Sequence, residues 1–306
     1  MALDHLQAQK YGKLELLARQ AVEGFITGLH RSPYHGFSVE FAEHRAYNTG
    51  ESTRHIDWKL YGRTDKMFVK RFEEETNLRC QIIIDTSGSM HFPDNEELNK
   101  LRFCVEATAA LTYLMRSQRD AVGITLFDQQ INLHLPPRGS SAHHSSIFYE
   151  LEQALEQKPV NGQSNIVDTL HLVAEQNASR SMVIVFSDFL DSAFNTEKNQ
   201  QKLFDALQHL RHNKHEVILF HVYDQNLELE FNLENRPHTF VDLETGEKIK
   251  LMPNEVQEAY RENRQRQISE IELTCAKFGI DWNGCNINQG IYTILDEFLV
   301  KRSRMG

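Results

Sequence analysis

The sequence has no hydrophobic run long enough to cross a membrane. Its longest uninterrupted apolar stretch is Met182–Phe186, whereas a membrane-spanning helix needs about 20 such residues. The N-terminus, MALDHLQAQKYGKLELL, lacks the basic start and apolar core of a secretory signal. We therefore expect a cytoplasmic protein without an integral membrane segment, which still leaves room for a membrane-bound partner.

Motifs of common enzyme classes are also absent. The Gly12-Lys13 pair has Gln7 where a phosphate-binding loop requires its first glycine. The sequence contains neither the G-x-S-x-G turn of serine hydrolases nor the H-E-x-x-H motif of zinc proteases. We therefore expect no enzymatic activity and, in particular, no ATP hydrolysis by this chain.

Excess positive charge and paired cysteines are missing as well. The net charge of −10 disfavours nucleic acid as a partner. The four cysteines form no C-x-x-C pair, which predicts buried, reduced thiols.

What the sequence does contain is an alternation of strand and helix patterns. Strands are predicted at 80–84, 121–127, 130–135, 182–186, 216–222 and 280–282. Helices are predicted near 13–29, 96–118, 164–178, 196–212, 254–277 and 289–302. This alternation predicts an α/β fold with a doubly wound, mostly parallel sheet. We expect residues 1–75 to form an N-terminal extension packed on a main domain at 76–306, which carries a β-hairpin insertion at about 224–253.

A metal site is predicted where the first buried strand ends. Three isoleucines at 82–84 form the apolar part of this strand. Asp85, Ser87 and Ser89 follow them at alternating positions. Carboxylate and hydroxyl oxygens are ligands that hard divalent cations prefer, whereas zinc and copper favour sulfur or imidazole.

Two later segments offer further oxygen ligands. Ser164 precedes a helix-like pattern, and Asp188 follows the apolar run 183–186. Because ligands of open α/β sheets bind beyond the carboxyl ends of the strands, these residues are expected to share a site with Asp85. The predicted cofactor is Mg²⁺ or Mn²⁺. The alternative is that these residues are ordinary turn and helix-capping residues.

This pattern resembles the von Willebrand factor A-like fold. The metal-ion-dependent adhesion site of that fold uses D-x-S-x-S, a threonine in a second loop and an aspartate in a third. Asp85, Ser87 and Ser89 match the first element, Asp188 matches the third, and Ser164 stands where threonine is usual. The resemblance implies the strand order 3-2-1-4-5-6. It also implies that an acidic side chain of a partner protein can complete the coordination of the metal.

A second resemblance lies in the polar N-terminal region. The segments are EFAEHRAY at 40–47, GESTRHIDWK at 50–59, GRTD at 62–65 and VKRFEEE at 69–75. They are similar to the bacterial family called domain of unknown function 58, with Glu51 in place of the usual aspartate. Members commonly accompany MoxR-type AAA+ ATPases, which implies such an ATPase as the partner.

The sequence thus favours a metal-dependent adaptor that binds proteins. One alternative is a phosphohydrolase that uses the same cation as a Lewis acid. Another is a scaffold that binds no metal.

Overall fold

The computed structural model describes residues 12–29, 44–46, 58–64, 68–70, 78–95, 97–158, 164–177, 180–190, 196–241 and 248–303. The chain divides into two compact units. The larger unit comprises Met1–Phe25 and Leu78–Gly306, and the smaller comprises Ile26–Asn77.

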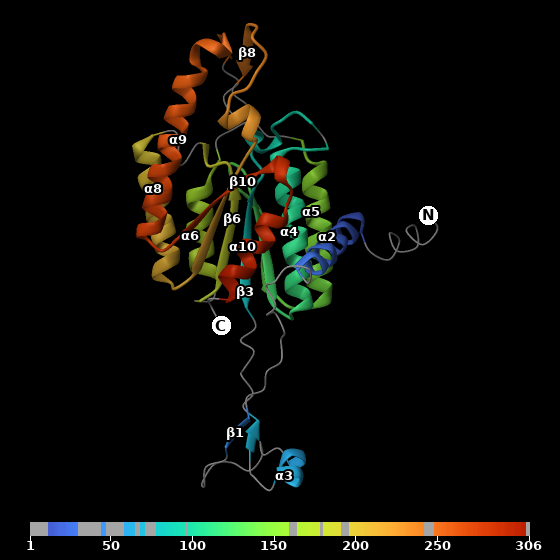
Figure 1. Cartoon of the computed structure of the whole chain (residues 1–306). Helices are drawn as coiled ribbons and strands as arrows, with labels where there is room; N and C mark the ends of the chain where they lie inside the picture. The colour runs from blue at the N-terminus through green and yellow to red at the C-terminus, as the bar shows by residue number, and fades with distance from the viewer. Residues whose placement is uncertain are drawn as a thin grey trace, which may run out of the picture. The chain divides into compact units, whose positions relative to one another are not determined.

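A six-stranded, mostly parallel sheet forms the centre of the larger unit (Figure 1). Its strands are β3 (Arg79–Asp85), β4 (Ala121–Phe127), β5 (Ile131–Arg138), β6 (Met182–Ser187), β7 (Glu216–Tyr223) and β10 (Asp281–Asn286). They lie in the order β10-β7-β6-β3-β4-β5, and only β5 runs antiparallel to its neighbour. Numbered along the chain, this order is 3-2-1-4-5-6, as the resemblance implies. The predicted α/β fold with a mostly parallel sheet is therefore confirmed.

Helices cover both faces of the sheet. The helices α6 (Ile166–Gln176), α8 (Glu197–His212) and α9 (Pro253–Lys277) pack on one face. The helices α4 (Lys100–Ser117), α5 (Ser141–Glu156) and α10 (Tyr292–Ser303) pack on the other. Residues Ile82, Ile83 and Ile84 of β3 are fully buried, because a central parallel strand is covered on both sides. All four cysteines are buried thiols, as predicted.

The N-terminal helix α2 (Lys13–Leu29) packs on the larger unit through one face. Leu14, Ala18, Val22 and Phe25 are buried at helical spacing. The backbone N–H of Leu14 donates to Glu152 of α5 at 3.0 Å.

Two further contacts of α2 reach α4 and α10. Glu15 pairs with Arg116 of α4 at 2.7 Å, and the ring of Phe25 stacks on that of Tyr292 in α10. The amphipathic helix predicted at 13–29 therefore has the covered apolar face that its pattern requires.

The smaller unit contains β1 (His44–Ala46), α3 (Trp58–Thr64) and β2 (Phe68–Lys70), with β1 and β2 antiparallel. The sequence predicts one N-terminal extension over residues 1–75. In the structure, residues 1–25 belong instead to the larger unit that contains the central sheet. That residues 26–75 pack on the main domain stays a prediction. Most of the polar segments between 40 and 75 lie outside the described residues.

The predicted hairpin is present in the 224–253 region. Strands β8 (His238–Val241) and β9 (Lys248–Leu251) pair antiparallel, while the turn between them lies outside the described residues. Phe231 packs on Phe240 of β8 and on Tyr260 of α9. The hairpin is therefore tied to the long helix that follows it.

None of the helices among the described residues is both long enough and apolar enough to cross a bilayer.

The burial of α2 generates a stability prediction. Leu14→Ala should lower the free energy of unfolding by about 3 kcal/mol, because it removes buried methyl groups and leaves a cavity. Leu17→Ala, in the same helix but 45% exposed, should cost less than about 1 kcal/mol. Urea unfolding monitored by circular dichroism measures both. Equal losses would contradict the packing of α2 through the Leu14 face.

Candidate functional site

The predicted site residues lie at the carboxyl ends of β3 and β6, which are adjacent at the centre of the sheet. In the order 3-2-1-4-5-6 this is the position where the chain reverses its direction of winding. Loops that leave neighbouring strands diverge at such a point and leave room for a ligand.

The first loop is held by the side chain of Asp85. Its Oδ1 accepts a hydrogen bond from the backbone N–H of Ser87 at 3.0 Å, and the hydroxyl oxygens of Ser87 and Ser89 lie 3.2 Å apart. Short aspartate side chains commonly stabilise turns in this way. All three residues are buried. The turn therefore fixes two serine hydroxyls beside a carboxylate.

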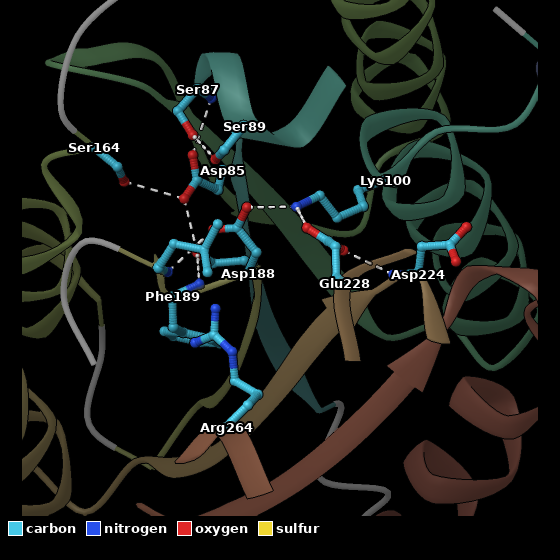
Figure 2. A network of polar contacts seen from close by, with 12 residues as sticks. Asp85, Ser87, Ser89, Lys100, Ser164, Asp188, Phe189, Asp224, Glu228 and Arg264 are labelled. Atoms are coloured by element: carbon cyan, nitrogen blue, oxygen red, sulfur yellow. Dashed lines mark hydrogen bonds and ion pairs between the residues drawn. The ribbon is translucent and has the colours of Figure 1, made fainter. Parts of the chain in front are cut away.

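The second and third loops bring their polar groups to the same carboxylate. Ser164 and Ser187 each donate a hydroxyl hydrogen bond to Oδ2 of Asp85, at 3.1 and 2.7 Å. Asp188 follows Ser187 directly along the chain, so the third loop joins the same cluster. Figure 2 shows the side chains of Ser87, Ser89 and Ser164 gathered around Asp85, with the carboxylate of Asp188 nearby and directed toward Lys100. We call the five predicted residues that meet here the strand-end site: Asp85, Ser87, Ser89, Ser164 and Asp188.

The backbone beside the strand-end site is strained. Phe189 follows Asp188 directly and has a φ of 53°, a left-handed conformation that costs energy for a bulky residue. Its N–H donates to the hydroxyl of Ser187 at 2.9 Å. Such strain is concentrated at functional sites.

A lysine that the sequence analysis did not predict lies within the cluster. Lys100 is fully buried, and its Nζ lies 2.7 Å from Oδ2 of Asp188 and 2.7 Å from Oε1 of Glu228 (Figure 2). Lysine is almost never buried without such partners. Lys100 precedes Cys104 by four residues, so it lies on the same face of α4 as the buried Cys104 and Leu111. This helical spacing could have predicted that Lys100 is buried.

Glu228 was also missed, because it lies in the region interpreted as an insertion. It is part of the single π-helical turn η3 (Gln225–Leu229), and its Oε2 accepts a hydrogen bond from the N–H of Asp224 at 2.8 Å. Asp224 in turn accepts from the N–H groups of Asn226 and Leu227. Short π-helical turns occur often at functional sites.

Burial makes this cluster electrostatically demanding. Burial and the charge of Asp188 raise the pKa of Asp85 to about 6. Burial alone would raise the pKa of Asp188, but the Lys100 ammonium lowers it overall. Burial raises the pKa of Glu228 despite the same ammonium. Asp188 and Glu228 share the Lys100 ammonium, while among the described residues no cation forms an ion pair with Asp85.

A small polar cavity adjoins the cluster. It has a volume of about 10 Å³ and is lined by Asp188, His221, Glu228 and Arg264 among others, which is room for about one water molecule. Burial lowers the pKa of His221 to about 3, so this imidazole is neutral at physiological pH. The cavity therefore has room for little more than water beside Asp188 and Glu228.

The donor set suits a hard cation through its serine hydroxyls as well as its carboxylates. Among the described residues, no group of three or more His, Cys, Asp or Glu side chains is arranged to hold a metal. A cation at the strand-end site would therefore depend on Ser87, Ser89, Ser164 and water beside the two aspartates. Magnesium commonly binds in this way, with few carboxylates and several waters.

The fold and this site define a mostly parallel α/β protein with a polar cluster at the switch point of its sheet. The family model described as "Protein of unknown function DUF58" matches residues 43–270. The chain therefore belongs to the DUF58 family.

Curated relatives include the uncharacterized proteins Mb1516 of Mycobacterium bovis and Rv1480 of Mycobacterium tuberculosis. Each is 24% identical over 177 residues, which is 58% of this chain and 55% of the relative. The chain thus spans about half the length of the curated relatives it matches.

Similar solved structures include two from Bacteroides. An aerotolerance-related membrane protein from Bacteroides fragilis is 19% identical, with a TM-score of 0.42 over 71% of this chain and 99% of that one. The conserved hypothetical protein BatB from Bacteroides thetaiotaomicron is 17% identical, with a TM-score of 0.44 over 74% and 99%.

The pKa of Asp85 predicts a specific pH dependence of stability. Its folded pKa of about 6 exceeds the ordinary value of 3.8, so the folded state binds a proton more tightly than the unfolded state. The stability contributed by protonated Asp85 is therefore lost as pH rises from about 4 to about 6. Asp85→Asn cannot ionise and should gain stability relative to wild type across this window, by roughly 3 kcal/mol at pH 7.5.

Urea unfolding in chelator at pH 4.5 and pH 7.5 measures this difference. Asp94→Asn, at an exposed position, controls for the removal of one carboxylate. A constant difference between Asp85→Asn and wild type at both pH values would contradict the expectation.

Proposed function

We propose that this chain is a protein-interaction module of the von Willebrand factor A-like kind, whose strand-end site holds Mg²⁺ or Mn²⁺. The observation that carries the proposal is the convergence of Asp85, Ser87, Ser89, Ser164 and Asp188 from three loops. The burial of Asp85 beside the charge of Asp188 supports it, because a divalent cation between the two carboxylates would offset their repulsion.

The residues of the strand-end site would have distinct roles. The hydroxyls of Ser87, Ser89 and Ser164 would be direct ligands, while Asp85 and Asp188 would act directly or through water. When bound, the cation would supply a coordination position that a partner's aspartate or glutamate can occupy. Asp85 would orient the serines, since it already accepts from Ser164 and from the backbone of Ser87.

An interaction role has more support than hydrolysis. A phosphohydrolase would need a base within reach of the substrate. His221 lies beside Asp188 and Glu228 in the small cavity, but only 3% of it is exposed and its pKa is lowered to about 3. A buried imidazole of such low basicity is a poor acceptor for a proton from a bound substrate.

A metal-free scaffold is the second candidate, and Lys100 favours it. The ammonium of Lys100 already supplies a positive charge to Asp188 at 2.7 Å. In that case the strand-end site would be a structural hydrogen-bond network. Metal binding by the folded chain separates the two candidates.

We further propose that the partner is a MoxR-type AAA+ ATPase. The chain belongs to the DUF58 family, and the resemblance to this family implies such an ATPase as the partner. A glutamate or aspartate of the ATPase would approach the strand-end site, where attraction to the cation is strengthened by the exclusion of water.

The metal proposal predicts that calorimetry will detect Mg²⁺ and Mn²⁺ binding to the wild-type chain. Ser87→Ala/Ser89→Ala removes two ligand hydroxyls and should weaken binding at least tenfold, or about 1.4 kcal/mol. Ser145→Ala, which removes an exposed hydroxyl on α5, should bind like wild type. Absence of binding to folded wild type at millimolar Mg²⁺ would leave the metal-free scaffold as the function.

The partner proposal predicts that the ATPase will be retained by wild type in a pull-down at millimolar Mg²⁺. Retention should fall with chelator and with Ser87→Ala/Ser89→Ala, while Ser145→Ala should retain wild-type levels. These serine changes are preferable to Asp188→Ala, which would leave the buried ammonium of Lys100 short of one partner and endanger the fold. Equal recovery with and without Mg²⁺ would exclude a metal-mediated contact.

A further inference from the structure

Both carboxylate oxygens of Asp188 already have contacts within the chain, one of them with the buried ammonium of Lys100. The Oδ2 atom of Asp188 lies 2.7 Å from Nζ of Lys100, and its Oδ1 accepts a hydrogen bond from the N–H of Leu190 at 3.2 Å. Each carboxylate oxygen therefore already has one contact within the chain. A divalent cation bound to Asp188 would lie close to the Lys100 ammonium and be repelled by it.

Glu228 gives the ammonium a place to remain when Asp188 is drawn elsewhere. Its Oε1 lies 2.7 Å from Nζ of Lys100, and its Oε2 is fixed by the N–H of Asp224. Lysine carries a compact charge on a flexible stem, so its ammonium can shift between acceptors that are this close. The backbone of Lys100 is meanwhile held by the start of α4, where Asn99 caps the helix by accepting from the N–H of Arg102.

We propose that Lys100 is a resident cation that competes with the divalent metal for Asp188 and thereby limits the metal affinity of the strand-end site. The proposal rests on the proposed function in that it takes this site to bind Mg²⁺ or Mn²⁺. Without metal, Lys100 keeps Asp188 paired and preserves the arrangement of the third loop. With metal, Lys100 relies on Glu228. Metal binding would thus replace the ammonium of Lys100 by the metal cation as the main positive charge beside Asp188.

A charge-matched double variant tests competition separately from net charge. Lys100→Met/Glu228→Gln removes one ammonium and one carboxylate, so the cluster keeps its formal charge while Asp188 loses its internal competitor. Calorimetry should show Mg²⁺ binding at least about tenfold tighter than in wild type, because an adjacent positive charge no longer opposes the metal. Millimolar Mg²⁺ should also raise the melting temperature of this variant more than that of wild type.

The matched control lies on the same helix. Arg102 and Glu106 form a partly exposed pair with an N···O distance of 3.8 Å, and Arg102→Met/Glu106→Gln makes the same chemical changes away from Asp188. It should bind Mg²⁺ like wild type. If the Lys100 double variant fails to fold, Glu228→Gln alone gives the test. Lys100 then pairs with Asp188 alone, and Mg²⁺ binding should weaken by more than it does in Glu106→Gln, which also removes one carboxylate.

Each outcome is decisive. Equal or weaker Mg²⁺ binding by the folded double variant, with wild type binding normally, overturns competition while the proposed metal site stands. Binding by the double variant but not by wild type supports competition and rejects the metal-dependent function of the native chain. Binding by neither rejects both. If Glu228→Gln has to serve as the test, binding that weakens no more than in Glu106→Gln overturns competition.

Discussion

The strand-end site is organised by the cost of burying two aspartates, Asp85 and Asp188, side by side. Two ionised carboxylates in a poorly hydrated place repel one another and lose their solvation, which raises the pKa of Asp85. The protein offsets the cost of burial differently for the two aspartates. Hydroxyl and N–H donors surround Asp85, whereas the ammonium of Lys100 neutralises Asp188. The positions of three loops, of the start of α4 and of η3 all follow from satisfying these two groups.

Sequence patterns could predict the sheet and the convergence of the five residues of the strand-end site because both depend on local rules. Buried parallel strands read as short apolar runs, and side chains that follow such strands gather at one edge of the sheet. The helix α5 was missed because its polar start, Ser141–Ser146, hides the apolar positions at Ile147 and Leu151. Lys100 and Glu228 could not be paired from sequence, since their contact joins elements 128 residues apart and depends on tertiary packing.

The family match extends beyond the sheet. It begins at residue 43, within the smaller unit, and ends at residue 270, within α9. It therefore includes β1, α3 and β2 together with every residue of the strand-end site, Lys100 and Glu228. The first strand of the larger unit leads directly into Asp85. The helix α2 and the last strand, β10, lie outside the match, although α2 covers α4 and α5 and β10 completes the sheet.

The two edges of the sheet differ in a way that bears on self-association. The outer strand β5 contains Pro136 and Pro137, and its register with β4 is interrupted at two points. Proline has no backbone N–H to donate, and an irregular edge is a poor template for a further strand. Growth of the sheet through β5 is therefore disfavoured, which protects this side of the protein from edge-to-edge aggregation.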